Sequence, residues 1–250
     1  CALLRILMPD RTDPLRVVVL ISGNGSNLQA IIDASKKNPG LYEVVAVISN
    51  RENAYGIERA DREGISSAII DHRAYDSRES YDHALMQIID AFEPELVVLA
   101  GFMRILTPEF VRHYAGRMLN IHPSLLPKYK GLNTHQRAID AGDKVHGCSV
   151  HFVTEALDDG PVVLQAEVPI LGDDTAETLA DRVHVQEHII YPEAVRRFAV
   201  LPGASRMENS SPPIRAGTSP ARVHSPSTSA MRNLASIPLA HCGTGDMTPI

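Results

Sequence analysis

Residues 16–37 read RVVVLISGNGSNLQAIIDASKK, and this stretch decides the fold. It opens with a short apolar run of β-branched residues, which is typical of a buried strand over residues 16–21. Apolar residues at helical spacing then predict a helix over residues 27–37, with Asn27 capping its start. A strand that leads through a glycine-containing loop into a helix is the first half of a β-α-β unit, so the sequence predicts an α/β protein.

The same alternation continues along the chain. The further strands that we expect are 43–49, 68–70, 95–100, 118–122, 145–153 and 161–170. The further helices are 54–63 (ended by Gly64), 77–92, 108–115 and 175–199, the last kinked or broken at Pro192. This order predicts a Rossmann-like fold, in which a mostly parallel, twisted sheet carries helices on both faces. Ligands of such folds bind at the carboxyl ends of the strands.

Composition divides the chain into three parts. Its 250 residues allow one domain of ordinary size, which we place at residues 16–199 after an N-terminal extension of residues 1–15. Residues 200–250 are rich in Ser and Pro and contain no Phe, Trp or Tyr, so we expect a disordered tail.

Charge and hydropathy argue against two classes of partner. The formal net charge is -6, and no basic excess marks a surface for nucleic acid or an anionic membrane. No apolar run approaches the ~20 residues that cross a bilayer. Cys1, Cys148 and Cys242 lie too far apart for a disulfide framework or a Cys-x-x-Cys metal site, which favours a reducing compartment. We therefore expect small-molecule partners, with no nucleic acid and no membrane.

The loop SGNGSN at residues 22–27 is a candidate phosphate site. Its glycines let the backbone approach a ligand, and the following helix offers free N–H groups and a partial positive charge. Ser26 and Asn27 add side-chain donors. Leu28 occupies the third glycine position of the dinucleotide-binding motif, so that motif is absent. A tight turn that merely caps the helix is the alternative.

Asn120 and His122 are the first catalytic candidates, because residues two apart on a strand point to the same side. An amide and a protonated imidazole can both donate hydrogen bonds to a developing oxyanion. A nearby carboxylate would keep the imidazole charged, and Glu155, Asp158 and Asp159 are candidates that spacing does not separate. The alternatives are a buried histidine bonded to backbone and a solvated acidic turn.

Two further motifs have open interpretations. LLPKYKG at residues 125–131 follows His122 and is either a mobile lid or a plain surface loop. Residues 184–188 read HVQEH, which matches the H-x-x-E-H zinc signature on a helix. The sequence marks no third ligand, so surface polar residues or substrate contacts are the favoured alternatives to zinc.

Five motifs together resemble the phosphoribosylglycinamide formyltransferase family, within the wider group of enzymes that use 10-formyltetrahydrofolate. They are SGNGSN at 22–27, GFMRIL at 101–106, NIHPSLLP at 120–127, HGCSVHF at 146–152 and the pair Leu157-Asp158. The resemblance runs in order from about residue 16 to residue 199. It implies a formyltransferase fold and a cytoplasmic enzyme of purine synthesis, monomeric or homodimeric, with 10-formyltetrahydrofolate as co-substrate and no metal.

The resemblance also implies roles for individual residues. The catalytic set would be Asn120, His122 and Asp158. The substrate 5-phosphoribosylglycinamide would be bound by Gly25, Ser26, Asn27, His184 and Glu187. The folate would be bound by Arg78, Met103, Arg104, Ile105, Leu106, Asn120, Thr154, Glu155, Ala156, Leu157 and Asp158.

The implied reaction is direct attack of the glycinamide amine on the formyl carbon, with Asn120 and protonated His122 stabilising the oxyanion. The alternatives are another formyltransferase or hydrolase that uses 10-formyltetrahydrofolate, and a nucleotide-binding module without catalysis.

Four residues depart from the family pattern. Lys130 and Asn133 stand where Pro and His are usual, Cys148 replaces Thr, and Asp159 replaces Gly. If the position of Asp159 requires a positive φ, the aspartate adds strain there.

Overall fold

The protein is described from a computed structural model, which describes residues 13–200. Most of the expected N-terminal extension and all but the first residue of the expected tail lie outside this range. That first residue, Val200, is the last residue of a helix. Within residues 13–200, no helix is both long and apolar enough to cross a membrane.

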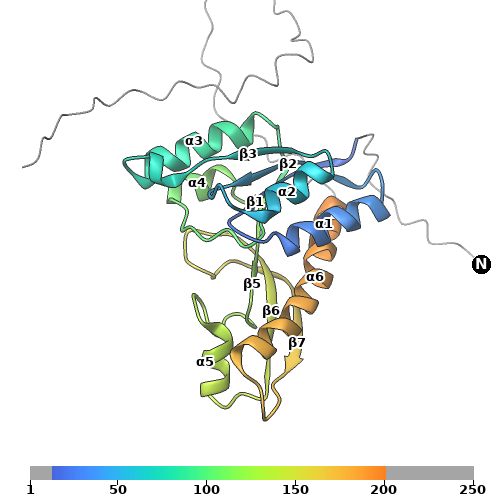
Figure 1. Cartoon of the computed structure of the whole chain (residues 1–250), viewed down its shortest axis with the longest axis vertical. Helices are drawn as coiled ribbons and strands as arrows, with labels where there is room; N and C mark the ends of the chain where they lie inside the picture. Colours follow the sequence, from blue (N-terminus) through green and yellow to red (C-terminus); the bar gives the residue numbers. More distant parts are fainter. Residues whose placement is uncertain (1–12, 201–250) are drawn as a thin grey trace, which may run out of the picture. The chain divides into compact units, whose positions relative to one another are not determined.

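Seven strands form one sheet in the described part of the chain, in the order β3-β2-β1-β4-β5-β6-β7 (Figure 1). Neighbouring strands from β3 to β5 are parallel, whereas β6 runs antiparallel to β5 and β7 antiparallel to β6. The strand bounds are Leu15–Ile21 (β1), Tyr42–Ser49 (β2), Ser66–Ile69 (β3), Leu96–Leu99 (β4), Met118–His122 (β5), Val145–Phe152 (β6) and Val162–Pro169 (β7). The predicted α/β class and mostly parallel sheet are confirmed.

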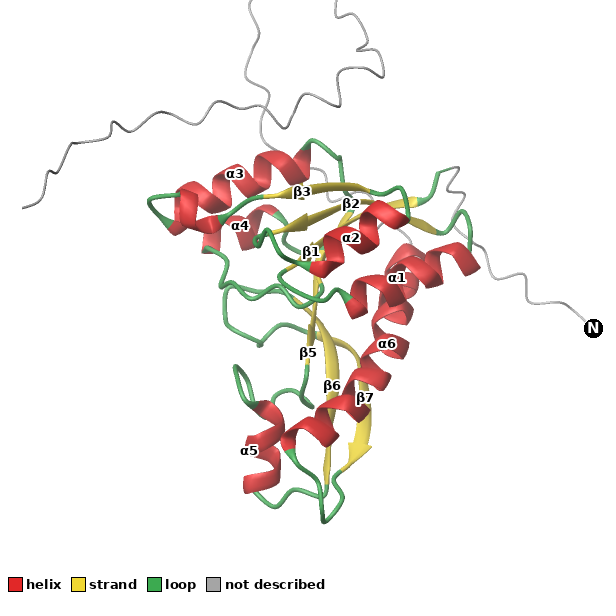
Figure 2. Cartoon of the chain, viewed as in Figure 1, coloured by secondary structure: helices red, strands yellow, loops and turns green. Residues whose placement is uncertain are grey.

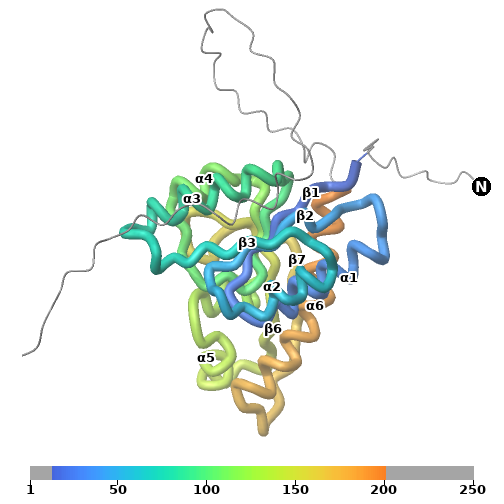
Figure 3. The backbone as a smooth tube through the Cα atoms, turned by 45° about the horizontal axis from the view of Figure 1, so that its top comes forward, coloured from blue at the N-terminus to red at the C-terminus, as the bar shows by residue number. Residues whose placement is uncertain are grey.

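Helices cover both faces of this sheet, as Figure 2 and the turned view in Figure 3 show. Their bounds are Ser26–Lys37 (α1), Tyr55–Arg62 (α2), Arg78–Asp90 (α3), Pro108–His113 (α4), Thr134–Asp140 (α5) and Ala176–Val200 (α6), with a 3-10 turn at His72–Ala74. Val17 and Val19 of β1 share a core with α1, α2 and α6. The alternate residues Val18 and Leu20 share the other core with α3 and α4. Because β1 is buried on both sides, its sequence is apolar without alternation.

Three local expectations need correction. Gly25, at φ 73°, precedes α1 and no side chain caps this helix, so the expected cap at Asn27 is wrong. The helix α6 continues through Pro192, so of the two expectations for this position the break is wrong. Buried residues on either side of the proline, including Tyr191 and Val195, belong to the core on this face of the sheet. The 3-10 turn at His72–Ala74 was not expected, since it is too short for a clear periodicity.

One hydroxyl ties α6 to the centre of the sheet. Tyr191 is fully buried, and its Oη lies 2.9 Å from the carbonyl oxygen of Leu99 in β4 and 3.1 Å from that of Leu119 in β5. The single hydroxyl proton is therefore shared between two strands that carry the loops of the candidate site.

Tyr191→Phe should lower the free energy of unfolding by about 1–2 kcal/mol, because it leaves two buried carbonyl groups without this donor. Urea unfolding followed by circular dichroism measures the change. Tyr75→Phe is the matched control, because the half-buried Tyr75 hydroxyl has no hydrogen-bond partner in the described chain. Equal stability of Tyr191→Phe and wild type would contradict this role.

A histidine pair lies where α5 meets β6. His146 Nε2 lies 3.2 Å from His135 Nδ1, and His146 is 1% exposed. Burial, and after it the neighbouring His135, lowers the pKa of His146 to about 4. An unfolded histidine has a pKa of about 6.5. The unfolded chain therefore binds this proton at a higher pH than the folded chain does, and stability is lost as the pH falls through this window.

We expect the free energy of unfolding of the wild type to decrease as the pH is lowered from about 6.5 to about 4. His146→Gln should make this decrease shallower, and the exposed His83→Gln on α3 should leave it unchanged. Urea titrations at several pH values measure both slopes. A His146→Gln slope equal to that of the wild type would rule out this histidine as the source.

Candidate active site

The carboxyl end of β5 carries the centre of the site. The antiparallel register of β5 and β6 places Asn120 opposite His151 and His122 opposite Ser149. Asn120 and His122 are two residues apart on one strand, so both side chains lie on the same side of the sheet. The chain then turns back after β6 and brings Asp158 to the same place.

Four polar side chains meet here. Asp158 Oδ2 lies 3.5 Å from His122 Nδ1, and Asp158 Oδ1 lies 3.8 Å from His151 Nε2. Asn120 Nδ2 lies 3.2 Å from His151 Nε2. The side chains of His122, His151 and Asp158 are all less than 10% exposed. In such a site, charges and dipoles interact more strongly than they would in water.

The hydrogen bonds of His151 define its tautomer. Its Nδ1 lies 2.9 Å from the carbonyl oxygen of Phe152, an acceptor, and must carry the proton. Its Nε2 is then the acceptor for the amide of Asn120. Burial lowers the pKa of His151, which favours this neutral ring. The sequence analysis assigned His151 no role, because only the pairing of β5 with β6 places it beside Asn120.

The structure separates the three acidic candidates. Asp158 faces His122, whereas Glu155 forms an ion pair with Arg112 at 2.9 Å and Asp159 forms one with Lys130. The residue with positive φ is Asp158, at 49°, and Asp159 does not share this conformation. The substitution at Asp159 therefore adds no left-handed strain to the turn.

Asp158 is held from two sides. The backbone N–H of Gly131 donates a 2.9 Å hydrogen bond to Asp158 Oδ2. At Gly160, a Cβ atom would lie 1.7 Å from the carbonyl oxygen of Phe152, so only glycine fits directly after the turn. The carboxylate is thus fixed before any ligand binds.

The loop between β5 and α5 closes onto His122. The carbonyl oxygen of Tyr129 lies 2.9 Å from His122 Nε2 and accepts its hydrogen bond. The ion pair of Lys130 with Asp159 joins the same loop to the turn that carries Asp158, so two departures from the family pattern are partners. Asn133, another departure, has a φ of 56° directly before α5, a conformation that asparagine tolerates well.

The last departure, Cys148, lies in the core behind the site. Its side chain is fully buried, and burial raises the pKa of the thiol to about 12. A thiol of this kind stays protonated at neutral pH and is a poor nucleophile. Cys148 therefore acts as a small core residue.

The predicted nucleotide residues also come together. Asn27 Nδ2 donates a 2.8 Å hydrogen bond to Glu187 Oε2, and His184 Nε2 lies 3.6 Å from the same oxygen. Glu187 is 4% exposed, and burial raises its pKa. Asn27 Oδ1 is buried and has no hydrogen-bond partner among residues 13–200, so this end of the site has an unused acceptor. Gly25 and Ser26 directly precede Asn27 at the start of α1.

The zinc interpretation of residues 184–188 gains no support. The rings of His184 and His188 stack with centroids 6.0 Å apart. Glu187 bonds to Asn27 instead of turning toward a shared metal position. Residues 13–200 contain no group of three or more His, Cys, Asp or Glu side chains placed to hold a metal ion.

Three of the predicted folate residues are exposed apolar side chains. Met103, Ile105 and Leu157 are 63%, 61% and 57% exposed. Arg78, in the first turn of α3, is exposed as well. Thr154 and Glu155 line a cavity of about 420 Å³ together with Val111, Phe152 and Val153.

Residues that the sequence analysis missed hold residues 103–107 in place. The backbone N–H of Met103 donates a 2.8 Å hydrogen bond to Ser22 Oγ, and that of Thr107 donates a 2.6 Å bond to Asp82 Oδ2. The Arg104 guanidinium lies over the ring of Tyr81 at 4.7 Å from its centroid. No local motif distinguishes Asp82 or Tyr81, since their contacts span 25 and 23 residues of sequence.

Comparisons with known proteins agree with this geometry. Residues 15–195 match the formyl transferase family. A phosphoribosylglycinamide formyltransferase of Escherichia coli (strain K12) is 58% identical over 185 residues, which are 74% of this chain and 87% of that protein. A trifunctional purine biosynthetic protein of Bos taurus is 48% identical over 192 residues, which are 77% of this chain but only 19% of that longer protein.

Solved structures give the same result. A phosphoribosylglycinamide formyltransferase of Coxiella burnetii is 57% identical with a TM-score of 0.72, covering 75% of this chain and 88% of that one. Glycinamide ribonucleotide transformylase 1 of Symbiobacterium toebii is 47% identical with a TM-score of 0.73, covering 76% and 89%. The sheet order, the residues gathered at the end of β5 and these likenesses agree: the chain belongs to the formyl transferase family.

Proposed function

We propose that the chain transfers the formyl group of 10-formyltetrahydrofolate to the amine of 5-phosphoribosylglycinamide, a step of purine biosynthesis. The observation that carries this proposal is the contact of Asp158 with His122, beside Asn120, at the carboxyl end of β5. This constellation supplies two hydrogen-bond donors and one fixed anion, which suit the oxyanion of an acyl transfer. The likeness to named formyltransferases supports the choice of substrates.

The two substrates would be bound by two different sets of residues. The phosphate would bind the backbone at Gly25, Ser26 and Asn27, where a helix begins. His184 and Glu187 would contact the ribose. The folate would be bound by Arg78, Met103, Arg104, Ile105, Leu106, Asn120, Thr154, Glu155, Ala156, Leu157 and Asp158.

The reaction needs no covalent enzyme intermediate. The amine nitrogen attacks the formyl carbon, and the carbonyl electrons move onto oxygen. Asn120 and a ring N–H of His122 donate hydrogen bonds to that oxygen, while Asp158 lies 3.5 Å from the other ring nitrogen and holds the ring in place. The amine then loses a proton, N10 of the folate gains one, and the bond from carbon to N10 breaks. The products are formylated glycinamide ribonucleotide and tetrahydrofolate.

Both donors are occupied before substrates bind. The amide of Asn120 bonds to His151, and His122 Nε2 bonds to the carbonyl of Tyr129. The formyl oxygen would therefore replace acceptors that already orient these groups. Preorganised donors of this kind require little rearrangement in the transition state.

A direct assay tests the proposed function. Purified protein is mixed with 10-formyltetrahydrofolate and 5-phosphoribosylglycinamide, and the folate absorbance is followed. We expect tetrahydrofolate and formylated ribonucleotide in equal amounts. Binding of the nucleotide without turnover would favour a non-catalytic module instead.

A cytoplasmic location is part of the same proposal, and the free, buried thiol of Cys148 is compatible with it.

His122→Ala and Asp158→Asn should each lower kcat by about 10²–10³-fold, because each removes a group that stabilises the oxyanion directly or through the ring. Nucleotide binding should change by less than about threefold, since Asn27 and Glu187 remain. Steady-state kinetics and calorimetry give the two values. Asp159→Asn, on the neighbouring carboxylate, is the control and should retain most of kcat. Near-full turnover by either test variant would refute the assigned role.

A further inference from the structure

Arg59 of α2 lies against the outer side of the phosphate loop. Its Nε donates a 2.9 Å hydrogen bond to the carbonyl oxygen of Asn24, and one terminal nitrogen donates a 3.0 Å bond to Asn24 Oδ1. The other terminal nitrogen lies 3.3 Å from Gln29 Oε1 in the first turn of α1. One guanidinium therefore bridges the loop and the helix that follows it.

The backbone of α2 also touches this loop. The N–H of Gly56 donates a 3.1 Å hydrogen bond to the carbonyl oxygen of Gly23. A Cβ atom at Gly25 would lie 2.7 Å from the Cα atom of Gly56. Because two glycines meet here, α2 approaches the loop closely enough for Arg59 to reach Asn24.

The charge of Arg59 is not neutralised locally. Its hydrogen-bond acceptors are a carbonyl and two amide oxygens, and no carboxylate of residues 13–200 forms an ion pair with it. Its field reaches the far side of the loop: after burial and His184, it is among the causes that lower the pKa of His188 on α6.

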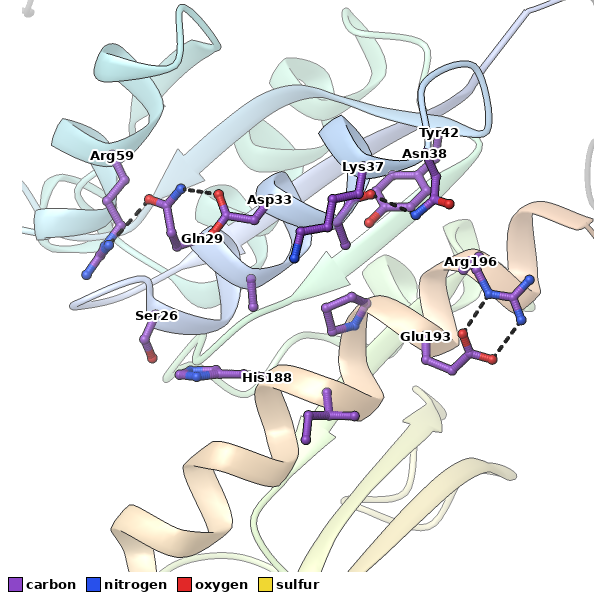
Figure 4. Close-up of a pocket in the computed structure, with 14 residues that line it drawn as sticks. Ser26, Gln29, Asp33, Lys37, Asn38, Tyr42, Arg59, His188, Glu193 and Arg196 are labelled. Carbon is purple, nitrogen blue, oxygen red and sulfur yellow. Dashed lines mark hydrogen bonds and ion pairs between the residues drawn. The ribbon is translucent and has the colours of Figure 1, made fainter.

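Arg59 also lines the cavity of about 630 Å³ between α1 and α6. Figure 4 shows Arg59, Ser26 and His188 at the same end of this cavity, with the hydrogen bonds from Arg59 through Gln29 to Asp33 along α1. A positive charge at this end lies beside the backbone that begins α1, where an anion is already favoured.

We propose that Arg59 is a positioning residue for the phosphate of the substrate. It fixes the conformation of residues 23–25 through Asn24 and adds a positive charge beside the first turn of α1. The identity of the physiological ligand rests on the proposed function. The inference itself is that phosphate binding at this loop depends on Arg59.

The test measures binding of ribose 5-phosphate by calorimetry to the full chain and to three variants. Arg59→Met should raise Kd by ~10-fold or more, since hydrogen bonds from a charged group and their orientation are lost. Arg59→Lys keeps the charge but not the planar fork, so its Kd should lie between those of wild type and Arg59→Met. Arg62→Met is the matched control, because Arg62 also lies over the Tyr55 ring but contacts Tyr55 and Glu58 instead of the loop.

Kinetics add a readout that a general loss of structure would not give. In Arg59→Met, KM for 5-phosphoribosylglycinamide should rise by ~10-fold, while KM for 10-formyltetrahydrofolate should stay within about twofold. If Arg59→Met does not fold, the Kd and KM values of Arg59→Lys are compared with those of the wild type instead. A Kd for ribose 5-phosphate equal to that of wild type in both variants, or no binding by wild type, would overturn the inference. Binding that depends on Arg59 without any turnover would instead overturn the proposed function and leave the inference standing.

Discussion

The antiparallel pairing of β6 with β5 is the constraint on which the site depends. In a wholly parallel sheet, the strand beside β5 would run in the same direction as β5. The residues of that strand would then pair with β5 in a different order. Here the reversed strand places His151 opposite Asn120, and the turn after it returns Asp158 to His122. A shift of β6 by one residue would turn His151 to the other face of the sheet, away from Asn120.

The buried polar groups of the site are satisfied by one another before any ligand arrives. Asp158 accepts a hydrogen bond from the Gly131 N–H. His122 donates one to the Tyr129 carbonyl oxygen, and Asn120 donates one to His151. Such a network is stable only if its members are hydrogen-bonded, because an unpaired buried polar group is costly. The same network orients Asn120 and His122, the donors of the proposed reaction, so the stability of the loops and the proposed chemistry depend on the same contacts.

The sequence predicted the fold from local patterns, because apolar strands such as 16–21 and periodic helices such as 27–37 are local features. It predicted Asn120 and His122 because they are neighbours on one strand. It left Glu155, Asp158 and Asp159 unresolved by spacing, and only the resemblance selected Asp158. The sequence analysis assigned no role to His151, Tyr129 or Arg59. Their partners lie on other segments, and a contact between distant segments cannot be predicted from a local pattern. The cap at Asn27 was wrong because its amide turns to Glu187 instead.

The most direct test of this account is a crystal structure of the protein with 5-phosphoribosylglycinamide and a folate analogue whose carbonyl group cannot be transferred. The account predicts that the carbonyl oxygen lies within hydrogen-bond distance of both Asn120 Nδ2 and a ring nitrogen of His122, with Asp158 still against that ring. A carbonyl group bound away from these two donors, or a complex in which Asp158 has left His122, would contradict it.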